Sequence, residues 1–133
     1  LNKGAGSAFG LEFQILDDAN HPDAKLGKDG NRTIGSLYDL ITAKQDKLVH
    51  PIGQWNYAFI RTDGTNVEHW LNGRLVVSYD RTSEAFRTAR AGSKYADAKY
   101  GANFGEWESG NILLQDHGNE VSFRSIKVRE LSK

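Results

Sequence analysis

The sequence predicts an all-β fold, an antiparallel β-sandwich with one short helix, and three observations indicate it. Several short segments alternate apolar and polar residues with the period of two that half-buried strands show. Turn signals such as Asp63-Gly64 and Asn72-Gly73 separate these segments. Glycine is abundant, with 14 residues, and proline is rare, with 2, which suits strands joined by tight turns. About seven such strands fit in the 133 residues, which is the profile of a sandwich or jelly roll.

Residues 9–18 are the first predicted strand, and the rest of the chain is organised around it. One face would be wholly apolar and would lie against the core: Phe9, Leu11, Phe13 and Ile15. Glu12 and Gln14 would share the other face, roughly 7 Å apart along the strand, and the acidic pair Asp17 and Asp18 follows at the exit. We interpret this polar face as the floor of a binding site. An ordinary half-exposed strand is the alternative.

The next strand is predicted over residues 36–41, after a long aperiodic connection. Residues 55–62, 67–71 and 74–80 each alternate, and tight turns join them, so they predict a three-stranded meander. The segment 82–90 predicts one short helix, because it is rich in helix formers and begins with hydroxyl and acidic residues.

The remainder of the chain is an irregular segment followed by two predicted strands. Residues 93–110 contain four aromatic side chains, which would either plug one end of a sandwich or line a carbohydrate cleft. Residues 111–118 and 120–131 alternate apolar and polar side chains and predict the last two strands. The whole chain, residues 1–133, is expected to be a single domain.

Composition and charge exclude several classes of function. Basic and acidic residues balance at 17 each, so the chain lacks the basic footprint of a nucleic-acid-binding protein or a membrane-surface patch. Cysteine is absent, which excludes disulfides and thiolate metal sites, and no apolar run is long enough to cross a bilayer. Methionine is absent as well, even at position 1, so we expect a processed or excised piece of a longer chain.

Motifs for nucleotide binding, serine nucleophiles, EF-hand loops and zinc sites are missing, although four histidines are present. What is left is a set of carboxylate, amide, histidine and aromatic side chains spread over the predicted strands. Its members are Glu12, Gln14, Asp17, Asp18, Tyr38, Glu68, His69, Trp70, Gln115, His117 and Arg124. Such groups are suited to acid–base chemistry on, or recognition of, a polyhydroxylated ligand.

Strand parity divides residues 67–71 into two possible faces. Val67 and Leu71 favour the core, which would place His69 with them and leave Glu68 and Trp70 on the opposite face. A carboxylate beside an indole suits a sugar ring, whose apolar face stacks while its hydroxyls seek acceptors. The other interpretation, equally open, is that Trp70 is a core residue and Glu68 pairs with an arginine.

Seven stretches, taken in order, carry a family resemblance. They are residues 10–18 (GLEFQILDD), 35–39 (GSLYD), 51–56 (PIGQWN), 67–73 (VEHWLNG), 77–80 (VSYD), 110–118 (GNILLQDHG) and 121–130 (VSFRSIKVRE). This sequence resembles the 3-keto-disaccharide hydrolase domain family, formerly the domain of unknown function 1080, of the concanavalin A-like lectin/glucanase jelly rolls. The resemblance implies a jelly roll that cleaves the glycosidic bond of a sugar already oxidised at carbon 3.

For that reaction the resemblance implies a base for the C2 proton, a donor or cation for the enolate oxygen and an acid for the leaving group. We expect the base and acid to come from Glu12, Glu68 and His69. The expected substrate-binding residues are Gln14, Asp17, Tyr38, Trp70, Gln115, His117 and Arg124. A divalent cation held by Asp17, Asp18 or Glu12 is a further option, and direct hydrolysis by paired carboxylates is an alternative route.

Members of the family usually begin with further strands upstream of the position of Leu1, so we expect a jelly roll that is incomplete at its N-terminus. Its strand edges would then need cover from another chain or a second copy. The resemblance also implies a bacterial protein of the periplasm or the extracellular space. The competing class is a carbohydrate-binding module that holds a sugar without cutting it, because the same fold hosts lectins.

Overall fold

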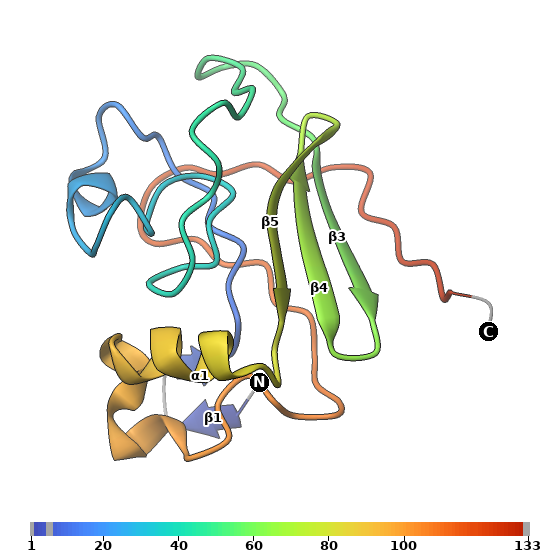
Figure 1. Ribbon diagram of the computed structural model, residues 1–133. Helices are drawn as coiled ribbons and strands as arrows, with labels where there is room; N and C mark the ends of the chain where they lie inside the picture. The colour runs from blue at the N-terminus through green and yellow to red at the C-terminus, as the bar shows by residue number, and fades with distance from the viewer. Residues whose placement is uncertain (1, 5–6, 132–133) are drawn as a thin grey trace.

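The computed structural model describes residues 2–4 and 7–131, and its centre is a three-stranded antiparallel sheet (Figure 1). The strands are β3 (Ala58–Asp63), β4 (Asn66–Leu71) and β5 (Arg74–Asp80), with β4 in the middle. This confirms the predicted meander, although β3 begins at Ala58 rather than at Trp55. No helix among the described residues has the length and apolar character that a bilayer crossing requires.

The turn between β4 and β5 shows why its two residues are needed there. Asn72 has φ 48° and Gly73 has φ 81°, and a two-residue hairpin turn with positive φ at both positions matches the twist of the strands. The Asn72 side chain also accepts a hydrogen bond from the Tyr57 backbone at 2.7 Å and donates one to the Leu48 carbonyl at 2.9 Å. The turn therefore anchors both the entry to β3 and the connection that precedes it.

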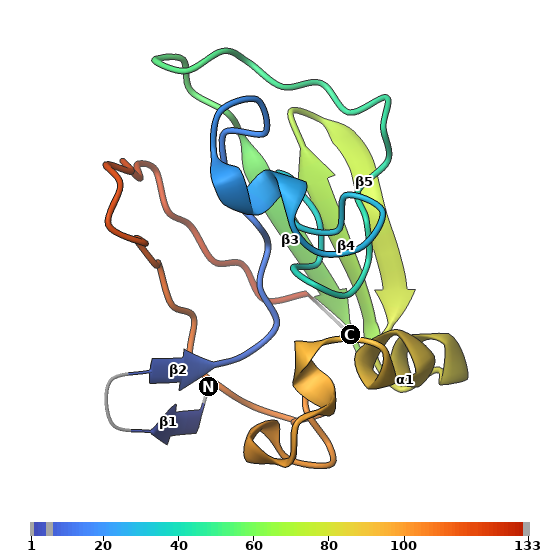
Figure 2. The same cartoon turned by 90° about the vertical axis from the view of Figure 1, so that its left-hand side faces the viewer.

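One face of the sheet is covered by irregular chain rather than by a second sheet. Figures 1 and 2 show the segment that follows β2 lying beside this face. Its apolar side chains, among them Ile34, Leu37 and Leu40, form one core cluster with the inward residues of β4 and β5. In β4 burial alternates, with Val67 and Leu71 buried, as strand parity predicted. The covering layer therefore sets which strand face is inside.

A register shift beside His69 and Trp70 alters the packing of β5. His69 is opposite Val77 and Trp70 is opposite Leu75, so Val76 is an extra residue in β5. Val76 and Val77 are consequently both buried, which strict alternation would not allow.

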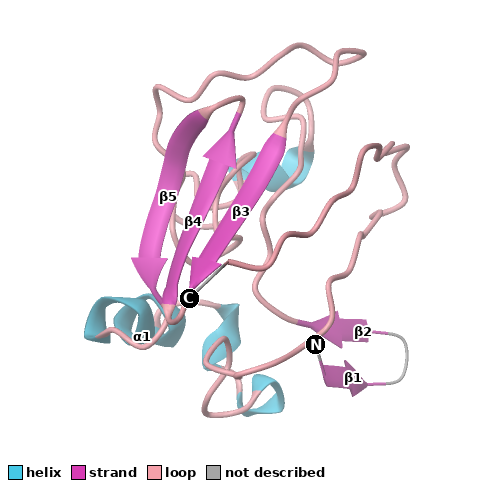
Figure 3. Ribbon diagram, turned by 90° about the vertical axis from the view of Figure 1, so that its right-hand side faces the viewer, coloured by secondary structure: helices cyan, strands magenta, loops and turns pink. Residues whose placement is uncertain are grey.

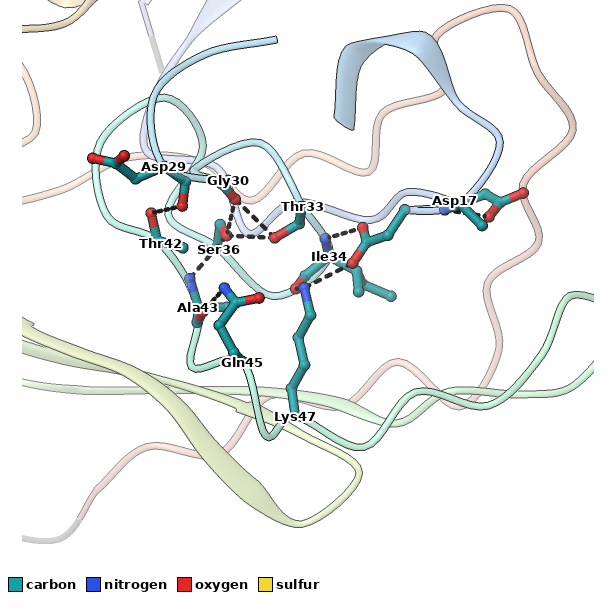
Figure 4. A network of polar contacts seen from close by, with 12 residues as sticks. Asp17, Asp29, Gly30, Thr33, Ile34, Ser36, Thr42, Ala43, Gln45 and Lys47 are labelled. Atoms are coloured by element: carbon teal, nitrogen blue, oxygen red, sulfur yellow. Dashed lines mark hydrogen bonds and ion pairs between the residues drawn. The ribbon is translucent and has the colours of Figure 1, made fainter. Parts of the chain in front are cut away.

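The covering layer is held by a polar network around Ile34 and Lys47 (Figure 4). Asp18 accepts a hydrogen bond from the Ile34 backbone at 2.7 Å and pairs with the Lys47 ammonium at 2.8 Å. Lys47 also donates to the Ile34 carbonyl at 2.9 Å, and the buried Ser36 hydroxyl accepts from the Ala43 backbone at 3.0 Å. A short 3₁₀ helix, η1 (Pro22–Lys25), lies in the same layer. Side-chain contacts thus replace the ladder of a regular sheet here.

The predicted helix is confirmed as α1 (Glu84–Ala91). Its N-cap is Ser83, whose hydroxyl accepts from the Phe86 backbone at 3.1 Å. Two 3₁₀ turns follow, η2 (Lys94–Ala96) and η3 (Ala98–Tyr100), and they lie with α1 near the lower end of the sheet in Figure 1. Tyr95 and Phe104 are buried and stack with ring centroids 4.1 Å apart. Residues in this segment therefore close one end of the core.

Four predicted strands do not form as expected. Residues 9–18 were expected to be one strand, but β2 (Ser7–Phe9) ends there and pairs with β1 (Asn2–Gly4), and beyond it only Phe13 forms a bridge, to Leu37. Residues 36–41 form turns around that bridge instead of a strand, so that prediction is wrong. The apolar face of 9–18 is confirmed in part, since Phe9, Leu11 and Phe13 pack on the core but Ile15 is 47% exposed.

The strands predicted at 111–118 and 120–131 are also wrong, because this segment has no regular secondary structure where the structure describes it. Figure 3 draws it as loop throughout its described part, and Ile112 and Val128 are 78% and 76% exposed. An alternating pattern gives a strand only where a neighbouring strand can take its hydrogen bonds, and no such neighbour is present in the described part of the chain. The described structure is β-rich with one helix, and the jelly roll stays a prediction.

Candidate functional site

The strongest candidate site surrounds the carboxylate of Glu12. Glu12 lies on the extended chain after β2, and its carbonyl accepts from the Tyr38 backbone at 3.0 Å, which places these two residues side by side. The Glu12 carboxylate accepts a hydrogen bond from the Tyr95 hydroxyl at 3.0 Å, although 83 positions separate the two residues. We call Glu12, Tyr38, Lys94 and Tyr95 the Glu12 cluster.

Lys94 brings a positive charge to this cluster. Its ammonium nitrogen lies 4.2 Å from the centre of the Tyr38 ring and 4.8 Å from the centre of the Tyr95 ring, which are cation–π distances. Its backbone N–H donates to Asp39 at 3.0 Å, and this bond fixes the start of η2. Burial lowers the pKa of Lys94, and the nearby carboxylates of Glu12 and Asp39 offset only part of that effect.

A half-buried ion-pair network lies beside the cluster. Arg32 contacts Asp23 and Asp39, each at 2.8 Å, and its guanidinium lies 5.1 Å from the centre of the Tyr38 ring. Burial disfavours the Arg32 charge, but its hydrogen bonds to both carboxylates outweigh burial and raise the pKa of Arg32. Both rings around Lys94 therefore contact other groups as well.

Both phenols of the cluster remain protonated at neutral pH. Burial raises the pKa of Tyr95, and the Glu12 carboxylate raises it further through its charge and its hydrogen bond. Burial likewise raises the pKa of Tyr38, and the nearby Asp23 carboxylate raises it further. A carboxylate, two neutral phenols and an ammonium group thus converge, and together they can accept a proton, donate hydrogen bonds and stabilise negative charge.

His69 lies elsewhere, on the inner face of β4. It is only 2% exposed, and its Nδ1–H donates to the Gly35 carbonyl at 3.1 Å, since a carbonyl can only accept. Its ring lies 4.8 Å from the ring of Phe13, and burial lowers the pKa of His69 to about 4. A cavity of about 180 Å³ adjoins it, lined by Leu11, Phe13, Ile60, Thr62, Val67, His69, Tyr79 and Arg81. Leu11 and Phe13 line this cavity, whereas Glu12, which lies between them in the chain, is not among the lining residues.

Glu68 and Trp70 lie on the outer face of β4, as strand parity predicted. The Trp70 indole N–H donates to the Glu68 carboxylate at 2.9 Å, and Arg61 of β3 lies 3.6 Å from the same carboxylate. Of the second interpretation, the pairing of Glu68 with an arginine is therefore confirmed, but the placement of Trp70 in the core is wrong. Trp70 is half-buried on this outer face and is not among the buried core residues. The three expected catalytic residues, Glu12, Glu68 and His69, thus occupy three different environments.

The remaining predicted site residues are dispersed over the chain. Gln14 is half-buried next to the Glu12 cluster, and its backbone pairs with Ser36 at 3.0 Å. Gln115 and His117 are exposed on the irregular C-terminal segment. Arg124, from the same segment, stacks over Trp55 with its guanidinium 3.9 Å from the ring centre. Of the expected site residues, the contacts join Glu12 with Tyr38 on the covering layer and Glu68 with Trp70 on the outer face of β4.

Asp17 and Asp18 have local structural partners. Asp17 accepts from the Asn20 side chain at 2.7 Å and from the Ala19 backbone at 3.1 Å, and the hydrogen bond from Asn20 is the main reason why the pKa of Asp17 is lowered. Asp18 is paired with Lys47. Within residues 2–4 and 7–131, no three histidine or carboxylate side chains gather in a way that could hold a metal ion. Among the described residues, Asp17, Asp18 and Glu12 thus belong to no cluster of ligands for the divalent cation that was considered as an option.

Sequence reasoning missed four residues of the site, namely Lys94, Tyr95, Arg32 and Asp39. The sequence did single out the aromatic-rich segment 93–110, so Tyr95 was a visible signal there. Nothing in a one-dimensional pattern pairs that segment with Glu12, because the contact depends on how η2 packs against the chain after β2.

Comparison with solved structures finds a related fold for this β-rich chain. It is similar to a crystal structure described as a "putative glycosyl hydrolase" from Parabacteroides distasonis ATCC 8503, with a TM-score of 0.59 and 27% identity, over 73% of this chain and 45% of that one. The chain belongs to the family of the 3-keto-alpha-glucoside-1,2-lyase-like domain, whose sequence model matches residues 1–129.

A curated relative gives the same family resemblance. The 3-keto-disaccharide hydrolase of Bacteroides thetaiotaomicron is 40% identical over 127 residues, which cover 90% of this chain and 43% of that protein. The chain therefore spans less than half the length of the relative that it matches.

Proposed function

We propose that this domain cleaves the glycosidic bond of 3-keto-glucosides, including 3-keto-disaccharides, by acid–base chemistry. The observation that carries the proposal is the Glu12 carboxylate, which accepts a hydrogen bond from Tyr95, while the ring of the same Tyr95 lies 4.8 Å from the Lys94 ammonium. Family membership and the name of the Bacteroides relative support the choice of substrate class.

In the proposed reaction, Glu12 removes the proton from C2, which the neighbouring C3 ketone makes acidic. The electron pair moves onto the C3 oxygen as an enolate, then returns to expel the oxygen substituent at C1, which takes up a proton. Water then adds across the C1–C2 double bond to give the free 3-keto sugar. Tyr38 and Tyr95 supply hydrogen-bond donors for the ligand, because both phenols keep their protons at neutral pH.

Among the three expected catalytic residues, geometry favours Glu12 as the base. Glu68 is already paired with Arg61 and Trp70 on the outer face. His69 is buried and has its pKa lowered to about 4, so it is a weak base for this step. Gln14 and Tyr38 are the nearest of the expected substrate-binding residues. The roles expected for Asp17, Trp70, Gln115, His117 and Arg124 stay predictions.

The test is turnover of a 3-keto-glucoside by the purified protein and by its Glu12→Gln variant, which keeps the shape but not the basic oxygen. We expect the variant to lose roughly a hundredfold to ten-thousandfold in rate, the usual contribution of a positioned base. Glu68→Gln is the matched control, because it removes a carboxylate on the other face, and its rate should stay within about twofold. Equal rates in the wild type and Glu12→Gln would overturn the assignment of the base.

A carbohydrate-binding module is the second candidate, and one observation favours it. Trp70 and Glu68 are adjacent on the outer face of the sheet, and the exposed Phe59 lies opposite Trp70 on β3. An aromatic platform beside a carboxylate can hold a sugar ring without reacting. Sugar binding that Trp70→Ala abolishes, with no product from any glycoside, keto or not, would favour the module.

We further propose a periplasmic or extracellular location, which fractionation of the source cells would test.

A further inference from the structure

Among the lysines that the structure describes, Lys94 is the one whose ammonium lies against aromatic rings inside the candidate site. The ammonium groups of Lys47 and Lys99 pair with Asp18 at 2.8 Å and Asp97 at 3.4 Å. Within the described residues, the Lys94 ammonium has no carboxylate within 4.0 Å, and its Nζ donates no hydrogen bond, since the bond to Asp39 comes from the backbone N–H. Its immediate neighbours are the faces of Tyr38 and Tyr95.

This arrangement leaves the N–H donors of Lys94 free while holding the charge in place. Ring faces attract a cation but accept no strong hydrogen bond, so a ligand oxygen can still take one from the ammonium. Each ring has a further contact: the Tyr95 hydroxyl donates to Glu12, and the Arg32 guanidinium lies 5.1 Å from the centre of the Tyr38 ring. Lys94 is an exposed residue, so a ligand can reach its ammonium, and the partial desolvation that lowers the pKa of Lys94 strengthens its interaction with an incoming negative charge.

The proposed reaction needs such a cation beside its base. When the C2 proton leaves, the negative charge appears on the C3 oxygen, one carbon away from the site of proton removal. A group that stabilises this oxygen must therefore lie close to Glu12 without forming an ion pair that neutralises it. Tyr95 contacts both Glu12 and Lys94, so the base and the cation share one fixed neighbour.

We propose that Lys94 binds the C3 oxygen of the 3-keto sugar and stabilises the enolate while Glu12 removes the C2 proton. This inference rests on the proposed function. It assigns the group that stabilises the enolate oxygen in the same step in which Glu12 removes the C2 proton. No bond forms to Lys94, which keeps all its protons and donates a hydrogen bond to the oxygen. Tyr95 is a positioning residue, since it orients the carboxylate and supports the ammonium.

The experiment isolates enolisation from bond cleavage. A 3-keto sugar with hydrogen in place of the C1 substituent has no leaving group, so the protein can only exchange its C2 proton with deuterated water. Proton NMR measures that exchange for the wild type, Lys94→Gln, Lys94→Arg and Lys99→Gln. Lys99 is the matched control, because its ammonium lies 5.0 Å from the Tyr100 ring in the next 3₁₀ turn. Thermal melting of each variant verifies that it is folded.

We expect Lys94→Gln to slow exchange about a hundredfold, the loss that removal of one oxyanion donor produces. Lys94→Arg should recover part of the rate because it restores the cation, and Lys99→Gln should match the wild type. Exchange by folded Lys94→Gln at the wild-type rate would overturn the role of Lys94 and leave the proposed function standing. Absence of exchange and of cleavage by the wild type would overturn the proposed function and this inference with it.

Discussion

At the scale of single residues, burial decides what a side chain can do. Glu12 and His69 both looked like acid–base residues in the sequence, and each faces a different environment in the fold. Glu12 is half-buried beside an ammonium and a phenol, whereas His69 is packed between Phe13 and Tyr79 on the inner face of β4. The same chemistry in the sequence therefore leads to a candidate base in one case and to a core residue in the other.

His69 makes stability depend on pH in a defined window. Its pKa is lowered from 6.5 to about 4 in the fold, so between these values the unfolded chain binds a proton that the folded chain does not. Stability is then complete above pH 6.5 and falls as the pH drops towards 4, by at most about 3 kcal/mol at 1.36 kcal/mol per unit. His69→Gln should remove this slope from urea unfolding measured between pH 7 and pH 4.5.

The control for that measurement is His117→Gln, because His117 is exposed. Its unfolding free energy should follow the wild-type pH dependence. Carboxylates with lowered pKa, such as Asp23, act below about pH 4, outside the window. An unchanged slope in His69→Gln would show that His69 is not buried in its neutral form.

At the scale of elements, α1 and the turns after it are joined to the core at Gly105. Its φ is +84°, and a Cβ there would lie 2.7 Å from Phe86 Cζ and 3.0 Å from Leu11 Cδ2. Phe86 is the buried residue of α1, and its ring stacks on Tyr79 of β5 at 5.8 Å. Close backbone approach at one glycine thus connects the helix, the sheet and the chain that bears Glu12.

Gly105→Ala should lower the free energy of unfolding by about 3 kcal/mol, which combines the penalty for positive φ with overpacking. Gly118→Ala is the matched control, because φ there is +87° but no atom lies within 4 Å of the added Cβ. The free energy of unfolding of Gly118→Ala should fall only by the penalty for a positive φ, about 1 kcal/mol. Chemical denaturation compares the two, and equal losses would contradict the packing at Gly105.

At the scale of the whole molecule, the sheet ends in an open edge. Every residue of β3 is exposed, including Ile60 at 52%, and the C-terminal segment exposes further apolar side chains. Edge strands with apolar side chains pair with other chains unless charges block them. The surface thus fits the expectation that another chain or a second copy covers these strands, and we propose a second copy.

We predict that the 14.8 kDa chain associates through β3 as its concentration rises. Ile60→Lys should reduce the association, because an edge lysine opposes strand pairing. Ser78→Lys is the control, since Ser78 is exposed on β5, the strand at the other edge of the sheet. Sedimentation measures the mass, and a single 14.8 kDa species at every concentration would contradict the prediction.

The sequence by itself determined the elements whose information is local. Asn72-Gly73 specified a turn that needs positive φ twice, Ser83 specified a helix start, and the alternation of 67–71 specified which face of β4 is buried. It also put Glu12 and Tyr38 among the candidate site residues. These features depend on neighbours a few positions away, which a pattern can register.

Only the tertiary structure decided the rest of the site and the state of the predicted strands. The contact between Glu12 and Tyr95 joins residues 83 positions apart, and Lys94 acquires its place from rings on two separate segments. Residues 111–131 alternate like strands but have no paired neighbour among the described residues. Long-range packing supplies both the partner that a strand needs and the burial that changes a pKa, and alternation along the chain contains neither.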